Sequence, residues 1–265
     1  MIRLAGVAAL VALLAAGATA AAQAPTKRPG TLTVGLNLPA TGFAVGSVKG
    51  DEIVFARGFE VDLAKALKAR LRLARVSFVN VADRSRFFAA GRKRFDLGLA
   101  RLIVQAPERR VDTSDAVLPA DLAVLLATGV PPIKTVADLR ALTLCVAKSG
   151  LGPSVARKRI GPTSPVVAVV GDNRLLDALE ERRCDAVLRE APLLAAALAA
   201  RDRRAFGAVA GRVATGAVMV ATLDRRSPLT PEVNRALAGL RRNGTIGRLA
   251  RRWLAFDPAR VRLLR

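Results

Sequence analysis

The sequence contains no histidine and no tyrosine, and only 4% of its 265 residues are aromatic. Histidine is the usual general base near neutral pH and the commonest metal ligand, so its absence argues against a metal site and against most acid–base enzymes. The two cysteines, Cys145 and Cys184, are too few for a disulfide-dense scaffold, but they can pair in an exported protein. We therefore expect no metal, no cofactor and no catalytic residues.

Acidic residues are also scarce, with 21 Asp and Glu against 43 Lys and Arg and a net charge of +22. Such a charge attracts anions, nucleic acid and acidic membrane surfaces. The basic residues are scattered among the predicted helices and lack interleaved aromatics, so we expect no nucleic-acid partner. A cationic surface-binding or nucleic-acid-binding protein stays as the weaker alternative, which a steep salt dependence of DNA binding would support.

The N-terminus has the layout of a secretory signal peptide. Arg3 precedes an apolar stretch at residues 4–16, and small residues follow at 17–22. The apolar stretch is shorter than the ~20 residues that a membrane span needs, which disfavours a retained anchor. The pattern predicts a signal peptide at residues 1–22, cleaved after Ala20 or Ala22, and a location in the periplasm.

Hydrophobic periodicity predicts two successive runs of alternating strands and helices. Two such runs in about 240 mature residues indicate two α/β lobes, each with a mainly parallel sheet. The first run is a strand at 31–36, a helix at 59–71, a strand at 76–81, a short helix at 84–90 and a strand at 95–100. The second is a short helix capped by Thr135 with Asp138, a strand at 142–147, a helix leading to a strand at 166–170, a helix at 174–182 capped by Asp172 or Asn173, a strand at 185–189 and a helix at 192–201. A strand at 213–222 and two helices, starting at Thr230 and near Ile246, complete the chain.

Residues 58–67, Gly-Phe-Glu-Val-Asp-Leu-Ala-Lys-Ala-Leu, resemble the signature of the periplasmic amino-acid-binding proteins, solute-binding protein family 3. Further segments match in the right order, so that the resemblance covers roughly residues 31–255. They are 31–35 (Thr-Leu-Thr-Val-Gly), 95–97 with 107–109 (Phe-Asp-Leu, Pro-Glu-Arg), 111–115 (Val-Asp-Thr-Ser-Asp), 184–188 (Cys-Asp-Ala-Val-Leu) and 243–246 (Asn-Gly-Thr-Ile) leading to Trp253.

The resemblance implies a two-lobed periplasmic-binding-protein fold whose lobes are joined by two crossing hinge strands. Lobe 1 would comprise residues 25–121 plus 219–265, and lobe 2 residues 122–218. A protein of this family would be a monomer and not an enzyme. It would capture an amino acid or similar small carboxylate in the cleft between the lobes and deliver it to an ABC transporter permease.

The resemblance also assigns ligand-binding roles to individual residues. Arg109, in the Pro-Glu-Arg motif, would grip the ligand's α-carboxylate, because a guanidinium binds a carboxylate through two parallel hydrogen bonds. Glu190 stands where the family usually has the Asp that binds the ammonium. The turn at Ser149 and Gly150 would offer backbone N–H groups to a carboxylate.

Other details are similar to the broad-range or acidic amino-acid binders of the family. In those proteins the equivalent of Arg86 reaches the ligand's side-chain carboxylate, and Asn37 and Phe43 would stand in the cleft wall. Cysteines occur in the relatives at the places of Cys145 and Cys184. If lobe 2 is a doubly wound sheet, strands 142–147 and 185–189 are neighbours, so we expect a disulfide. Two buried free thiols are the alternative.

The sequence also departs from the family pattern. The usual Gly-x-Thr-x-Thr run is replaced by residues 101–106, with one residue inserted, so an unusual ligand or weak binding is an alternative. A few relatives are cyclohexadienyl dehydratases, and in such an enzyme Glu190 or Lys148 would be the acid. Incubation with prephenate or arogenate would distinguish this enzyme from a binding protein.

Overall fold

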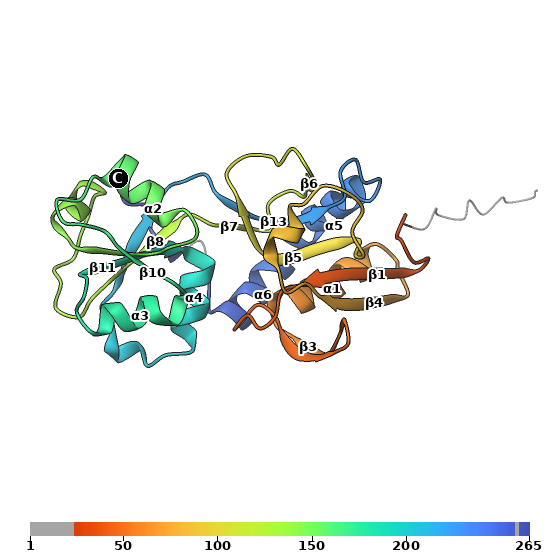
Figure 1. Ribbon diagram of the computed structural model, residues 1–265, viewed down its shortest axis with the longest axis horizontal. Coiled ribbons are helices and arrows are strands. Elements are labelled where there is room, and N and C mark those ends of the chain that lie inside the picture. Colours follow the sequence, from red (N-terminus) through yellow and green to blue (C-terminus); the bar gives the residue numbers. More distant parts are fainter. Residues whose placement is uncertain (1–23, 258–259) are drawn as a thin grey trace, which may run out of the picture.

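The computed structural model describes residues 24–257 and 260–265. Two α/β lobes lie side by side along the long axis of the molecule (Figure 1). The predicted signal peptide lies outside the described residues. In the part of the chain that is described, no helix has both the length and the apolar character needed to cross a membrane.

Lobe 1 contains an eight-stranded sheet in the order β2-β3-β4-β1-β5-β13-β6, with β7 pairing to β13. Strand β1 is parallel to β4 and β5, whereas β13 is antiparallel to β5. The carboxyl ends of β1, β4 and β5 therefore lie at one edge of the sheet, facing lobe 2. The strands are β1 Thr31–Leu36, β2 Val45–Lys49, β3 Glu52–Arg57, β4 Arg75–Asn80, β5 Leu97–Val104, β6 Asp112–Thr113, β7 Leu118–Pro119 and β13 Val218–Leu223.

Helices α1 (Phe59–Arg70), α5 (Thr230–Arg242) and α6 (Thr245–Leu254) pack against one another on lobe 1. The sequence predicted each of them from an apolar stripe at helical spacing. The helix expected at 84–90 is wrong in type, because only a 3-10 turn, η1 (Arg84–Phe87), forms there. The side chain of Asp83 holds this turn by accepting a hydrogen bond from the Ser85 N–H at 2.9 Å.

Lobe 2 contains a five-stranded sheet in the order β10-β9-β11-β8-β12. Strand β9 is parallel to both β10 and β11, as expected for a doubly wound unit. The strands are β8 Leu122–Leu126, β9 Leu144–Ala147, β10 Val167–Val169, β11 Ala186–Glu190 and β12 Val209–Val213. The helices are α2 Gly152–Val155, a π-helical turn Ala156–Ile160, α3 Asp172–Glu180 and α4 Ala191–Ala199, with 3-10 turns at Ala137–Ala141 and Arg203–Ala205.

The predicted disulfide between Cys145 and Cys184 is confirmed, with the two Cα atoms 5.7 Å apart. Cys145 lies in β9, and its register partner in β11 is Val187. Cys184 precedes β11, so the bridge runs diagonally from β9 to the turn before β11, rather than between two facing strand residues. It ties this turn of lobe 2 to the middle of the sheet.

The chain passes from the first sheet to the second between β7 and β8, and returns between β12 and β13. These two crossings and the two α/β sheets confirm the predicted two-lobed fold. The sheets are mixed rather than mainly parallel, because β13 and the hairpin of β2 and β3 add antiparallel pairs to lobe 1, and β8 and β12 add them to lobe 2. Helix α4 of lobe 2 packs against α6 of lobe 1 where the lobes meet (Figure 1).

The last six residues differ from the expected division into lobes, because they pack on lobe 2. Leu263 forms a parallel bridge with Arg212 of β12, and Leu264 is 3% exposed within the core of lobe 2. The Nε atom of Arg262 also donates a hydrogen bond to the carbonyl oxygen of Ala210 at 2.8 Å. For the rest of the chain, the expected lobe boundaries stay a prediction.

Candidate functional site

A cavity of about 230 Å³ lies between the lobes, and both lobes supply its walls. Its walls come from the segment after β1 and from β5 in lobe 1, and from α3 and α4 with Ala200 in lobe 2. Two charged residues line it, Arg101 from lobe 1 and Asp172 from lobe 2. The remaining lining residues are Pro39, Ala40, Thr41, Phe43, Asn173, Leu193, Ala196, Ala197 and Ala200.

Arg101 is held in an uncommon backbone conformation, with φ of 55° in the left-handed region. A non-glycine residue in this region is strained, so surrounding contacts must hold it. Its backbone N–H donates to Oε1 of Glu60 at 2.6 Å, and its Nη2 donates to Oδ1 of Asn37 at 2.7 Å. The Nε atom is buried and has no hydrogen-bond partner among the described residues. The guanidinium is therefore positioned at the cavity with bonding capacity left over.

Glu60, in the first turn of α1, contacts the backbone of Arg101 and is 1% exposed. Burial raises the pKa of this carboxyl, while the hydrogen bond from the Arg101 N–H and the charges of Arg101 and Arg84 oppose the rise. Its Oε2 atom has no hydrogen-bond partner within the described part of the chain. By accepting this hydrogen bond, Glu60 stabilises the left-handed backbone conformation of Arg101.

Arg84, at the start of η1, stands beside Arg101 and donates from Nη2 to the Arg101 carbonyl oxygen at 3.0 Å. Desolvation lowers the pKa of its guanidinium, and the like charge of Arg101 lowers it further. The charges of Arg189 and Asp172 in lobe 2 also act on it. Among the described residues, neither the guanidinium of Arg84 nor that of Arg101 has a carboxylate oxygen within 4.0 Å. Two cations at the edge of lobe 1 therefore lack an ion-pair partner.

On lobe 2 the acidic groups are already paired with one guanidinium. Arg189 donates from Nη1 to Oε2 of Glu190 at 2.7 Å, and its Nε lies 2.7 Å from Oδ1 of Asp172. The Leu151 N–H donates to Oε1 of Glu190 at 2.8 Å. Both oxygens of Glu190 are thus bonded within lobe 2, and the residue is 2% exposed.

The turn before α2 needs a glycine at position 150. Gly150 has φ of 109°, and a Cβ atom there would stand 2.6 Å from Oε1 of Glu190 and 2.9 Å from Nη1 of Arg189. The carbonyl oxygen of Ser149 accepts a hydrogen bond from Arg189 Nη1 at 3.3 Å. In this structure the turn at residues 149–151 therefore binds the carboxylate of Glu190 through the Leu151 N–H.

Four of the seven predicted ligand-binding residues lie together with these groups. Asn37 holds Arg101, and Glu190, Ser149 and Gly150 form one cluster with Arg189. Phe43 lines the cavity but is buried, and its ring packs edge-on against Phe59, with the ring centroids 6.2 Å apart.

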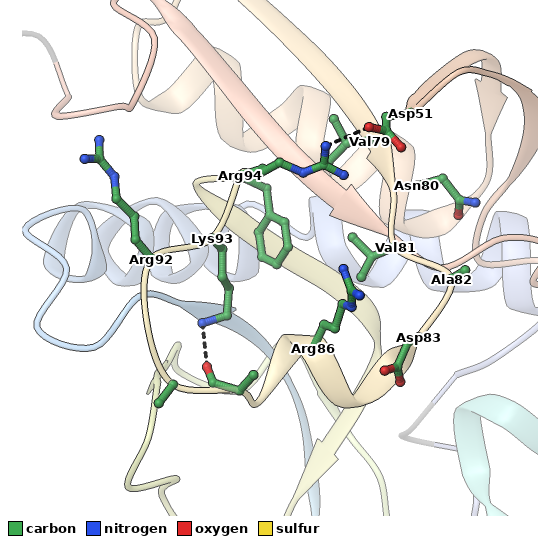
Figure 2. Close-up of a pocket in the computed structure, with 13 residues that line it drawn as sticks. Asp51, Val79, Asn80, Val81, Ala82, Asp83, Arg86, Arg92, Lys93 and Arg94 are labelled. Atoms are coloured by element: carbon green, nitrogen blue, oxygen red, sulfur yellow. Dashed lines mark hydrogen bonds and ion pairs between the residues drawn. The ribbon is translucent and has the colours of Figure 1, made fainter.

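The other two, Arg109 and Arg86, lie elsewhere. Arg109 is exposed in the loop after β5 and is not among the residues that line the interlobe cavity. Arg86 lines a separate cavity of about 460 Å³ in lobe 1, shown in Figure 2, near Lys93 and the ion pair of Arg94 with Asp51. The ligand roles of all seven residues stay predictions.

Sequence reasoning gave no ligand role to Arg84, Arg101, Arg189 or Asp172. A signal for Arg101 existed, because it begins the run that replaces the usual Gly-x-Thr-x-Thr. Asp172 was expected only as a helix cap, but Gly171 is the N-cap of α3 and no side chain caps it. For the described ranges, 24–257 and 260–265, no group of three or more Cys, Asp, Glu or His is arranged to hold a metal ion.

Solved structures of similar fold include an ancestral cationic amino acid solute-binding protein, at 24% identity and a TM-score of 0.68, with 85% of this chain and 96% of that chain covered. A structure of an arginine-binding protein from T. maritima matches at 22% identity and a TM-score of 0.60, covering 86% and 96% of the two chains. The AbpA substrate-binding protein of an amino acid ABC transporter from Streptococcus pneumoniae, bound to L-arginine, matches at 18% identity and 0.61, covering 85% and 95%.

At these identities the structural matches establish the fold alone. The family assignment comes from the sequence profile of the bacterial extracellular solute-binding proteins, family 3, which matches residues 46–256. This range includes both crossings between the sheets, Arg101 and the lobe 2 residues that line the cavity, and the disulfide. The chain belongs to the bacterial extracellular solute-binding proteins, family 3.

Proposed function

We propose that this protein captures an amino acid or a similar small carboxylate between its lobes and delivers it to an ABC importer. The observation that carries the proposal is the interlobe cavity, where Arg101 of lobe 1 and Asp172 of lobe 2 present opposite charges. A ligand that contacts both lobes would favour their closure around it. The cavity of about 230 Å³ is smaller than the ~300–1,000 Å³ typical of sites for drug-sized ligands, which supports a small solute.

The location and the partner follow from the same proposal. Family membership and the predicted signal peptide support an extracytoplasmic, periplasmic protein. One similar structure is described as the substrate-binding protein of an amino acid ABC transporter. By analogy the macromolecular partner of this chain is a transporter permease, and the protein acts as a monomer without a cofactor.

An enzyme on the same fold is the alternative, because one similar structure is described as a precursor of cyclohexadienyl dehydratase. The geometry gives this alternative little support. Glu190, the expected acid, has both oxygens bonded within lobe 2, and Lys148 is an exposed residue. Aromatic product after incubation with prephenate or arogenate would refute the non-enzymatic proposal.

Ligand identification tests the proposal directly. The mature chain, starting at residue 23, is purified and examined by native mass spectrometry for a carried-over ligand. It is then titrated calorimetrically with the twenty amino acids and with small mono- and dicarboxylates. We expect saturable binding of at least one of them, and a smaller radius of gyration by X-ray scattering when it is bound. Failure of every compound to bind would refute the proposal.

A further inference from the structure

We infer that the cleft takes a small neutral α-amino acid, whose ammonium is received by Asp172 and whose carboxylate is received by Arg101 with Arg84 beside it. The inference rests on the proposed function and names the ligand class of the same cleft. It replaces Glu190 and Arg109 as the charge-pairing residues. It also excludes the arginine-like ligands described for some similar structures.

The ammonium assignment follows from which acid is accessible. Glu190 is 2% exposed, does not line the cavity, and accepts hydrogen bonds from Leu151 and Arg189. The side chain of Asp172 is 30% exposed and lines the cavity. Although its Oδ1 lies 2.7 Å from Arg189 Nε, the two atoms are not aligned for a hydrogen bond, and both lack a hydrogen-bond partner in the described residues. Arg189 is therefore hydrogen-bonded to Glu190, whereas its contact with Asp172 is an ion pair without a hydrogen bond, and Asp172 is the acid of the two that lines the cavity.

The carboxylate assignment follows from which guanidinium reaches the cavity. Arg101 lines it and has a buried Nε without a partner in the described part of the chain. Arg84 is fixed next to it by the hydrogen bond to the Arg101 carbonyl oxygen. Arg84 does not line the cavity, so Arg101 is the residue that would donate to the carboxylate. A bound anion would also relieve the repulsion between the two adjacent guanidinium groups.

The size and the walls of the cavity define the side chain that fits. Apart from Arg101 and Asp172 the lining is uncharged, and alanines and Leu193 form most of its lobe 2 side. A charged ligand side chain would lose its hydration without gaining an ion-pair partner. A short apolar side chain would instead be removed from water against these residues.

The test compares L-alanine with propionate, which has the same carboxylate and methyl group but no ammonium. The wild type should bind L-alanine about tenfold to hundredfold more tightly than propionate, the range expected for a hydrogen bond to a charged group. Asp172→Asn should abolish this preference, whereas Glu190→Gln should retain it. Asp202→Asn, which changes an exposed acid of lobe 2, is the matched control and should leave both affinities unchanged. Arg101→Met should weaken both ligands by about tenfold or more.

The outcomes separate the inference from the proposed function. If the wild type binds none of the amino acids or carboxylates, the proposed function fails. If it binds L-alanine but the preference over propionate survives in Asp172→Asn and is lost in Glu190→Gln, only the ammonium assignment fails. A larger loss in Arg109→Met than in Arg101→Met overturns the carboxylate assignment. Tighter binding of L-arginine or L-glutamate than of L-alanine overturns the ligand class. Because the preference is a ratio measured on one sample, a variant's partial unfolding does not alter it.

Discussion

Removal of the Cys145–Cys184 disulfide should destabilise the protein through its unfolded state. The bridge closes a loop with a sequence separation of 39 residues. The chain-entropy relation gives about 4 kcal/mol for a loop of this length at 25 °C. Since domains of this kind have a total stability of ~5–15 kcal/mol, the bridge supplies a quarter or more of it. Both sulfurs are buried, so the Cys145→Ala/Cys184→Ala double variant also loses a small amount of packing.

The assay is urea unfolding followed by circular dichroism, with and without a thiol reductant. The reduced wild type and the double variant should both lose about 4 kcal/mol, and their m-values should rise because the unfolded chain becomes more expanded. Reductant should leave the double variant unchanged, which makes that variant the control for other effects of the reagent. A loss below about 1 kcal/mol in both samples would refute the entropic argument. Two free thiols in the denatured, unreduced wild type would refute the bond itself.

Three further predictions concern stability. Gly150→Ala should cost about 1–3 kcal/mol, because the new Cβ would stand 2.6 Å from Glu190 Oε1 at a φ of 109°; an unchanged urea midpoint would contradict this. Burial raises the pKa of Glu60 above its ordinary value of 4.5, so its proton binds more tightly in the native state. The wild type should therefore gain stability relative to Glu60→Gln as the pH falls from above the raised pKa toward 4.5; a difference that stays flat with pH excludes the effect. Leu264→Ala should cost about 2–4 kcal/mol in chemical unfolding, whereas Leu263→Ala, at a 43% exposed position, should cost under about 0.5; equal losses would show that the tail does not pack on lobe 2 as described.

Much of the fold could be predicted because its signals are local. Apolar stripes at helical spacing marked α1, α5 and α6, and alternation of strands with helices marked two α/β units. Thr135 and Asp138 were expected as a capping pair, and each of their backbone N–H groups bonds to the side chain of the other, although the N-cap of the 3-10 turn that follows is Val136. One exception is the 3-10 turn in place of a helix at 84–90, where the apolar residues are consecutive, at 87–90, and do not recur along one helical face before Gly91.

The disulfide was predictable for a different reason. Once the family resemblance implied a doubly wound second lobe, strand order followed from topology, and the neighbouring strands brought Cys145 and Cys184 together. The diagonal geometry of the bridge was not predictable, because strand register depends on pairing between segments about 40 residues apart.

The candidate site depended most on tertiary structure. The sequence pointed to Arg109 and gave Arg101 no role. That Arg101 lines the interlobe cavity depends on its left-handed backbone, which Glu60 of α1 stabilises from another part of the chain. The sequence also placed Glu190 where the family has its ammonium-binding acid. In the structure, however, Leu151 and Arg189 bond to both oxygens of Glu190. A motif fixes which charges are available to a site. Contacts between residues distant in sequence decide which of these charges remain available to a ligand. The physical reason is that burying an unpaired charge is costly, so buried charges tend to be paired within the protein.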